Sequence, residues 1–244
     1  PEISINSTAQ DIITQYIQTL NQQIDLIANN NDISKKLIVS TITAVGKNKQ
    51  KYLEKSAEKL GIPLFQVENY HSKETKETLR SLDADLGVLY GTNIIRKAVF
   101  QIPKLGSINI HQGLAPLYRG GPTVFWELFN GEDKIGITIH YVASKVDTGD
   151  LILQKTVPLR YDLDKYGTDY ERFLADFRAT LVEPSSVLMA EAIELIGQGK
   201  EQKTMQDTSI GKRYRLPTKQ EKNGLIKKLN ERIFWKHREI WEFY

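Results

Sequence analysis

The chain has 244 residues, of which 40% are hydrophobic and 26% are charged. This balance excludes a wholly disordered, collagen-like or membrane-spanning chain, and the length suits one large α/β domain. The net charge of +3 is too small to indicate a nucleic acid or membrane partner by itself. Cysteine is absent, which excludes disulfides and thiolate metal sites and makes a reducing, cytoplasmic setting the expectation.

The first half of the chain alternates expected helices and strands. An apolar stripe at helical spacing predicts an amphipathic helix between Ser7 and Ile27. Short apolar or β-branched runs predict strands, and charged stretches between them predict helices. The strands are expected at 37–45, 64–67 and 86–90, and the helices at 46–60 and 73–82. Such alternation is typical of a Rossmann-like, doubly wound and mostly parallel sheet, whose ligands bind at the carboxyl ends of the strands.

The second half continues the alternation and then becomes basic. Further strands are expected at 107–111, 136–142 and 150–157, and helices at 122–130, 168–181 and 184–196. Between Lys212 and Lys228, basic residues far outnumber the one acid, and a last helix then runs into a group of aromatic side chains. We therefore divide the chain into a main α/β domain over 1–210 and a basic, aromatic C-terminal helical extension over 211–244.

Familiar cofactor motifs are missing from the sequence. No Walker A sequence is present, and no Gly-x-Gly-x-x-Gly fingerprint follows an expected strand. The four histidines never pair at a short ligand spacing, so we expect no metal site.

The most unusual group of polar residues lies between Gly106 and Gly149. Asn109 and His111 are two apart on an expected strand, which directs both side chains to one face. A loop with three glycines and two prolines follows, a composition that lets backbone approach a ligand closely and move over it. Asp147 lies in a turn after the strand that carries His140, within reach of the other two side chains.

One amide, one imidazole and one carboxylate without a nucleophilic side chain suit direct transfer of an acyl-type group to an amine. The amide would donate to the developing oxyanion, and the imidazole would take or relay the proton of the amine. The carboxylate would orient the imidazole or a water and manage the proton sent to the leaving nitrogen. The alternative interpretation is a hydrogen-bonded Asn-x-His pair at a strand end and an Asp-Thr-Gly turn, neither with a catalytic role.

Residues 106–157 resemble the core of the 10-formyltetrahydrofolate-dependent formyltransferases, the family of methionyl-tRNA, glycinamide ribonucleotide and nucleotide-sugar formyltransferases. The matching motifs are Asn109-x-His111, Pro116-x-Tyr118-Arg119-Gly120, Trp126, Gly131-Glu132, Gly136-x-Thr138-x-His140 and Asp147-x-Gly149. Weaker similarity extends from about Leu37 to Pro217. The resemblance implies the formyltransferase fold, 10-formyltetrahydrofolate as the formyl donor, and Asn109, His111 and Asp147 as the catalytic residues.

The resemblance also implies binding residues for the folate. The positions that match where the pterin is bound, largely by backbone, are Gly91, Thr92, Asn93, Ile95 and Val146. Expected substrate-binding residues are Tyr118, Arg119 and Gly120 in the loop and Arg213, Tyr214 and Arg215 in the basic extension. Arginine there would suit a diphosphate, and an aromatic ring would suit a base. A solvated basic helix face is the alternative interpretation of the extension.

The sequence departs from the family pattern at two places. The family's first strand has no clear counterpart within 1–30, so it lies upstream of Pro1 or this protein opens differently. After the histidine, Gln112 and Gly113 replace the Pro-Ser pair that many members carry, and Ala115 stands where leucine is usual. These changes touch the loop and the choice of acceptor but leave the catalytic residues intact.

The acceptor that we expect is a small amine, and first a nucleotide-linked amino sugar. Members that act on tRNA carry a further C-terminal barrel, whereas this chain ends 27 residues after Pro217. Glycinamide ribonucleotide enzymes usually lack the Tyr-Arg-Gly and tryptophan features, but that acceptor or another small amine stays an alternative. Hydrolysis of 10-formyltetrahydrofolate and a noncatalytic nucleotide-binding module are further alternatives. A nucleic acid partner is disfavoured, a membrane is not expected, and a homodimer is left open.

Overall fold

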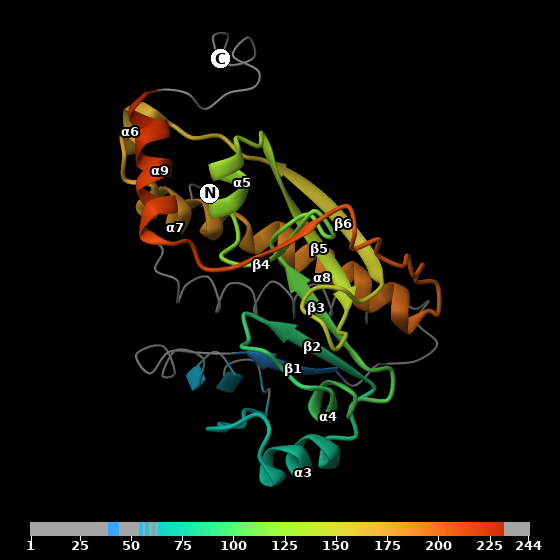
Figure 1. Cartoon of the computed structure of the whole chain (residues 1–244). Helices are drawn as coiled ribbons and strands as arrows, with labels where there is room; N and C mark the ends of the chain where they lie inside the picture. The colour runs from blue at the N-terminus through green and yellow to red at the C-terminus, as the bar shows by residue number, and fades with distance from the viewer. Residues whose placement is uncertain (1–38, 44–53, 56, 59–60, 62, 232–244) are drawn as a thin grey trace.

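The computed structural model describes residues 39–43, 54–55, 57–58, 61 and 63–231 (Figure 1). The helix expected at 7–27 and the closing aromatic residues lie outside this part of the chain. A five-stranded sheet with the order β1-β2-β3-β5-β6 forms the centre, and helices pack around it. The expected α/β class is therefore confirmed.

The sheet has a parallel half and an antiparallel half. The strands β1 (Val39–Thr43), β2 (Leu86–Tyr90) and β3 (Ser107–His111) are parallel. β5 (Lys134–Tyr141) and β6 (Leu151–Pro158) form an antiparallel hairpin that joins the edge of β3. Leu86, Val88 and Leu89 of β2 are all buried, as expected of a strand with both faces covered.

The helices lie at both ends of the sheet and behind it. Figure 1 shows α3 (Lys73–Ser81) and α4 (Lys97–Phe100) near β1 and β2, and α5 (Phe125–Asn130), α6 (Leu163–Tyr166), α7 (Tyr170–Thr180) and α9 (Lys219–Asn230) at the other end. The long α8 (Val182–Gly197) contacts β5 and β6. None of the helices in the described ranges is both long and apolar enough for a membrane span.

Local sequence explains where several helices begin. The Ser72 hydroxyl accepts from the Thr75 N–H at 3.1 Å and caps α3. Thr218 and Glu221 form a reciprocal capping box at the start of α9. Each such cap satisfies backbone donors that would otherwise lack a partner, which stabilises a helix by about 1 kcal/mol.

One large hydrophobic core joins the sheet to the helices. Phe125, Met189 and Leu225, from α5, α8 and α9, are each less than 2% exposed and belong to it. Burial of a side chain of this size contributes about 1.5–3 kcal/mol. The part of the C-terminal extension in α9 therefore packs into the same core as the sheet. A second, smaller cluster of Leu89, Ile95, Val99 and Phe100 lies beneath the loop that follows β2.

A two-stranded parallel sheet was not predicted. β4 (Tyr118–Gly120) in the loop after β3 pairs with β7 (Lys212–Tyr214) in the extension. The Tyr118 and Tyr214 rings stack with their centroids 5.1 Å apart. At Gly211 a Cβ would lie 1.8 Å from the Pro116 carbonyl oxygen, so the backbone fits here only without a side chain. This pairing brings the extension beside the loop.

One expected element is wrong, and one begins later than expected. Residues 64–67 do not form a strand, and Leu64 and Phe65 are 44% and 52% exposed. This short run contains the polar Gln66 and does not define burial, and among the described residues β1 is an edge strand that pairs with β2 alone. α5 begins at Phe125 rather than at Pro122, because 121–124 form a loop beside the site.

Candidate active site

Two neighbouring strands bring an amide and two imidazoles together. In the antiparallel register of β3 and β5, Asn109 lies opposite His140 and His111 lies opposite Thr138. Asn109 Nδ2 is 3.2 Å from His140 Nε2, within hydrogen-bond distance. Asn109 and His111 share one face of β3, as predicted, because residues two apart on a strand point the same way.

Asp147 joins the two imidazoles from the turn between β5 and β6. Its Oδ2 lies 3.5 Å from His111 Nδ1, and its Oδ1 lies 3.4 Å from His140 Nε2. Oδ2 also accepts the Gly120 backbone N–H at 2.8 Å. The carboxylate is 11% exposed, so all of these interactions form largely away from water.

The turn that carries Asp147 is fixed by close backbone packing. Asp147 has a left-handed backbone with φ of 50°. A Cβ at Gly149 would lie 1.8 Å from the Tyr141 carbonyl oxygen, so glycine lets the turn lie directly on β5. Gln206 Nε2 donates to the Gly149 carbonyl at 2.6 Å and holds the turn from the other side.

The hydrogen bonds of the two imidazoles define which nitrogen of each can accept a proton. His111 Nε2 is 2.7 Å from the Tyr118 carbonyl, which can only accept, so Nε2 carries the hydrogen. In neutral His111 the lone pair is then on Nδ1, which faces Asp147. His140 Nδ1 donates to the Tyr141 carbonyl at 2.8 Å, which leaves its Nε2 as the acceptor for Asn109. Asn109 keeps a second N–H for another partner.

Burial and charge set opposite protonation states for the two central groups. Burial lowers the pKa of His111 below 6.5, and the nearby Asp147 charge opposes this only in part. Burial raises the pKa of Asp147, but the hydrogen bond that His140 donates when its ring is protonated, together with the positive charges that His111 and His140 can carry, outweighs it and holds that pKa at about 2. At neutral pH His111 is therefore an uncharged base beside an ionised carboxylate. A proton taken up by His111 Nδ1 would form an ion pair with Asp147.

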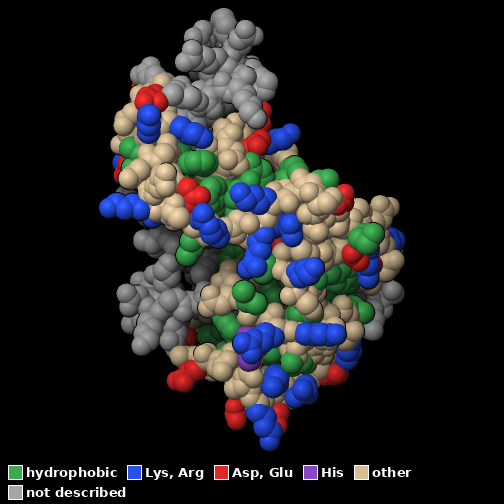
Figure 2. Space-filling view, in the orientation of Figure 1, with side chains coloured by type: hydrophobic (Ala, Val, Ile, Leu, Met, Phe, Trp, Pro, Cys, Tyr) green, Lys and Arg blue, Asp and Glu red, His purple; other side chains and the backbone are tan. Residues whose placement is uncertain are grey.

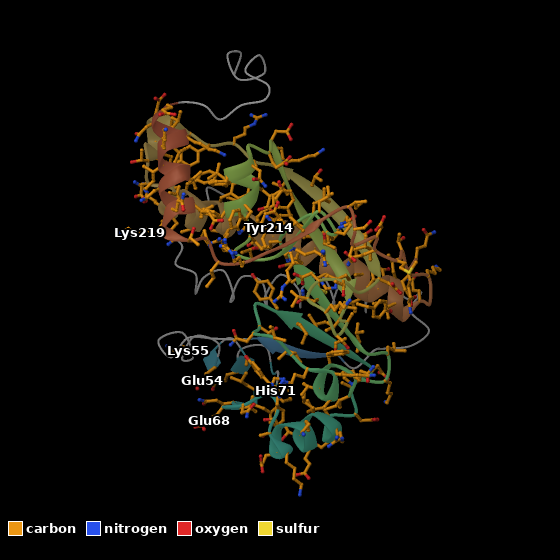
Figure 3. All side chains as sticks on the ribbon, viewed as in Figure 1. Glu54, Lys55, Glu68, His71, Tyr214 and Lys219 are labelled. Carbon is orange, nitrogen blue, oxygen red and sulfur yellow. The ribbon has the colours of Figure 1, made fainter. Side chains whose placement is uncertain are left out.

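These residues form the floor of a cavity of about 860 Å³. One side is the loop after β2, with Gly91, Thr92, Asn93, Ile94 and Ile95. The other side carries Arg178 and the run from Arg213 to Leu216. Figure 2 shows lysine and arginine side chains gathered across the middle of this face, and Figure 3 shows Tyr214 and His71 on opposite sides of that region. His71 Nε2 accepts the Arg96 N–H at 3.0 Å at the end of the first loop.

The structure brings most of the sequence-predicted residues to this cavity. All five positions matched to folate binding line it, together with Gly120, Arg213, Tyr214 and Arg215. Tyr118 and Arg119 do not line it. The Tyr118 hydroxyl donates to Glu132 at 2.8 Å, and the Arg119 guanidinium donates to the Pro116 and Thr208 carbonyls. Their side chains support the loop from behind.

A family model described as formyl transferase matches residues 10–182, about seven tenths of the chain. The chain belongs to the formyl transferase family. This confirms the family expected from the motifs, and the matched stretch contains Asn109, His111 and Asp147. The match begins at residue 10, ahead of β1, so it includes residues outside the part of the chain that the structure describes.

Curated relatives of this chain include methionyl-tRNA formyltransferases. The protein from Listeria innocua is 35% identical over 154 residues, which are 62% of this chain and 49% of the relative. The protein from Halalkalibacterium halodurans is 34% identical over 179 residues, 73% of this chain and 54% of the relative. The chain spans about half the length of the curated relatives it matches.

Solved structures of the family share the fold. The formyltransferase PseJ from Anoxybacillus kamchatkensis, in complex with UDP-4,6-dideoxy-4-formamido-L-AltNAc and tetrahydrofolate, is 25% identical, covers 73% of this chain and 85% of its own, and has a TM-score of 0.50. A sugar N-formyltransferase from Shewanella covers 87% and 82% with a TM-score of 0.59 at 16% identity. Glycinamide ribonucleotide transformylase 1 from Symbiobacterium toebii covers 78% and 89% with a TM-score of 0.56 at 22% identity.

Sequence reasoning missed three contributors to the site of this family member. His140 was noted as part of a motif but not as the partner of both Asn109 and Asp147, a role that the antiparallel register of two expected strands would have indicated. Gly113 leaves the space that the His111 ring fills, because a Cβ there would lie 2.4 Å from Nε2. Arg178 reaches the cavity from α7 and carried no sequence signal. No cluster suited to a metal ion occurs among the described residues.

Proposed function

We propose that this chain transfers a formyl group from 10-formyltetrahydrofolate to a primary amine, and that the amine belongs to a nucleotide-linked amino sugar. The observation that carries the proposal is the single cavity whose floor is Asn109, His111 and Asp147. Family membership supports the transfer chemistry. The two different sides of the cavity suggest separate places for the donor and the acceptor.

The floor suits attack of an amine on a formyl carbon. The amine nitrogen forms a bond to that carbon, and the formyl oxygen becomes an oxyanion that the free N–H of Asn109 stabilises. His111 Nδ1 takes a proton from the attacking nitrogen, and the resulting imidazolium is stabilised by Asp147. The intermediate then collapses, the bond to N10 of the folate breaks, and N10 receives the proton that His111 had taken up, which restores neutral His111 beside Asp147. The products are the formamide and tetrahydrofolate.

His140 acts as a positioning residue in this proposal. Its Nε2 accepts one N–H of Asn109 and so fixes the plane of the amide with the second N–H available. Its Nδ1–H is held by the Tyr141 carbonyl, which keeps the ring from rotating. Preorganised donors of this kind need no rearrangement when charge develops, which is why they lower the barrier.

The loop of Gly91 to Ile95 and the turn at Val146 form the donor side. Ile95 is 6% exposed and packs on Phe100, which anchors the loop, while Gly91 and Asn93 keep their backbone exposed. Backbone groups on such a loop can pair with the edge of a pterin. The tetrahydrofolate bound to PseJ supports a folate as the donor.

Arginine side chains form the acceptor side. Arg213 and Arg215 line the cavity, and guanidinium groups suit phosphoryl oxygens. The role of Tyr214 here is to hold the wall rather than to stack on a base, since its ring is already packed against Tyr118 and Trp126. Tyr118 and Arg119 act through the backbone and the fold of the loop. The UDP-sugar bound to PseJ supports an acceptor of this class.

A second acceptor is favoured by a different observation. The curated relatives at 34–35% identity are methionyl-tRNA formyltransferases. A terminal aminoacyl group also presents a primary amine near phosphates, so this acceptor suits the same cavity. Glycinamide ribonucleotide is a third primary amine with a phosphate.

Mass spectrometry of reactions with a panel of amines tests the proposal. The protein is incubated with 10-formyltetrahydrofolate and, separately, UDP- and dTDP-linked amino sugars, glycinamide ribonucleotide, methionyl-tRNA, or no acceptor. We expect a mass increase of one formyl group on an amino-sugar nucleotide. Formylation of only methionyl-tRNA or glycinamide ribonucleotide would contradict the sugar acceptor. Donor consumption that needs no acceptor and formylates none of the amines would indicate a hydrolase. Absence of donor consumption in every reaction would contradict the transfer itself.

A further inference from the structure

Arg178 places a positive charge on the cavity wall that sequence patterns did not reveal. It lies in the last turn of α7, and its half-buried side chain lines the cavity beside Gly121, Pro122 and Thr123. One of its N–H groups donates to the Thr123 carbonyl at 2.5 Å. A guanidinium has five N–H donors, so a single carbonyl leaves most of them for other partners.

No carboxylate lies within ion-pair distance of Arg178 in the described part of the chain. The acid that influences it most is Glu127, which is 2% exposed and has one carboxyl oxygen without a hydrogen-bond partner. Burial raises the pKa of Glu127 to about 7, so at neutral pH this acid is ionised only in part. The charge of Arg178 is therefore incompletely balanced by the protein.

The arginines on this wall differ in how far they are neutralised. Arg215 forms a two-pronged ion pair with Glu221, at 2.9 and 3.1 Å. Arg213 is exposed and forms no ion pair among the described residues. Arg178 is the most buried of these three arginines. A charge-assisted hydrogen bond becomes stronger where water is excluded. An anion in the cavity would thus gain most from Arg178.

The loop that Arg178 holds is also under backbone strain. Val124 is fully buried, and its φ of 73° is a left-handed conformation that is unfavourable for a β-branched residue. Such strain costs of the order of 1–3 kcal/mol and persists only where surrounding contacts enforce it. The Arg178 bond to Thr123 is one such contact, so this side chain both shapes the wall and lines the cavity.

We infer that Arg178 is a specificity-determining residue that binds the pyrophosphoryl group of the acceptor through its free N–H donors. It lies on the wall across from the loop of Gly91 to Ile95. Naming the ligand as the acceptor rests on the proposed function. The anion site itself does not, because it can be measured without any formyl transfer. Arg213, at the mouth of the same wall, supplies a second and more solvated charge.

Calorimetric titration of the protein with inorganic pyrophosphate tests the site. We expect Arg178→Gln to weaken binding roughly tenfold to a hundredfold, the effect of losing one charge-assisted bond. Arg178→Lys should give an intermediate loss, because lysine keeps the charge without the planar fork. Arg172→Gln is the matched control, since Arg172 lies on the same helix and outside the cavity, over the Tyr166 ring. It should bind like the parent.

The outcomes separate this inference from the proposed function. Equal pyrophosphate affinity in the parent and Arg178→Gln proteins, or an equal loss in Arg172→Gln, would overturn the site. If Arg178→Gln does not fold, unchanged affinity in Arg178→Lys overturns it equally. Tighter binding of adenosine monophosphate than of pyrophosphate would overturn the diphosphate assignment and favour a tRNA end. A loss specific to Arg178 in a protein that formylates no amine would keep the anion site and remove the proposed function.

Discussion

The floor and the arginine wall of the cavity are built in different ways. The floor comes from two paired strands of one sheet, β3 and β5, and from the turn after β5, so strand register and one turn determine its geometry. The wall combines α7 with the segment around β7, which pairs with a strand far back in the chain. In the proposed function, the chemistry therefore depends on local backbone geometry and the acceptor contacts depend on tertiary packing, so substitutions in the two regions should have different effects.

The largest effects are expected on the floor. Asn109→Ala removes an oxyanion donor and should reduce kcat about a hundredfold or more, and Asp147→Asn should do the same by removing the charge that stabilises protonated His111. Single-turnover kinetics with saturating donor and acceptor measure this loss. Asp150→Asn, three residues further along the same turn and outside the cavity, is the control. Folded Asn109→Ala and Asp147→Asn proteins with the parent rate would show that the floor is not the active site.

The next effect concerns the fit between Gly113 and His111. A Cβ added by Gly113→Ala would lie 2.4 Å from His111 Nε2 and 2.9 Å from the Tyr118 carbonyl, so the ring must turn from its hydrogen bond. An off-rotamer ring costs about 0.5–1.5 kcal/mol, which corresponds to a loss of up to about tenfold in kcat. Gly224→Ala, in α9 outside the cavity and with the nearest atom 3.5 Å away, should leave the rate unchanged. Equal rates for both variants would mean that His111 does not need this orientation.

A smaller effect is expected for the exposed arginines of the wall. Arg213→Ala should raise the KM for the acceptor by roughly threefold to tenfold without changing the KM for the folate, because a solvated charge contributes less than a buried one. Arg215→Ala should raise the KM for the acceptor less, since Glu221 already neutralises Arg215. Lys222→Ala is the control, because Lys222 pairs with Glu171 away from the cavity. An equal rise in both Michaelis constants would mean that the two sides of the cavity are not separate.

The smallest effect is a displacement of the pH profile. Neutral His111 is the reactive form in the proposed mechanism, and burial lowers its pKa, so the midpoint of the inactivating protonation lies below pH 6.5. Asp147, with a pKa of about 2, stays ionised throughout this range. We therefore expect kcat/KM to keep more than half of its plateau value at pH 6.5 and to fall at lower pH. A midpoint above pH 6.5 would assign the base to another group.

The arrangement of the floor residues could be predicted from the sequence because strand geometry is simple. Asn109 and His111 share a face by alternation, and the structure gives β2 and β3 the bounds that their apolar patterns predicted. The segment 64–67 carried a similar but shorter pattern, and Leu64 and Phe65 lie exposed, since three apolar residues beside Gln66 do not reveal whether a neighbouring strand will pair with them.

The residues of the arginine wall could be predicted from the sequence only in part. The arginine-rich stretch around Tyr214 marked a basic segment, but nothing in it showed a three-residue parallel pairing with β4, because such a short pair is set by the packing of distant segments. Arg178 looked like any charged residue near the end of an amphipathic helix. The tight fit of Gly113 against His111 likewise depends on side-chain direction, which spacing alone does not give.

The β4 and β7 pairing has a consequence for how this enzyme scaffold can change its acceptor. The strand β7 pairs with β4 through three residues, and it carries Arg213, with Arg215 directly after it, without supplying any group to the floor. New substrate preferences can therefore arise by replacing one surface ribbon while the reacting atoms stay where they are. Under the proposed function, grafting the segment 205–218 between relatives should therefore alter the acceptor contacts made by Arg213 and Arg215 while Arg178 and the floor stay unchanged.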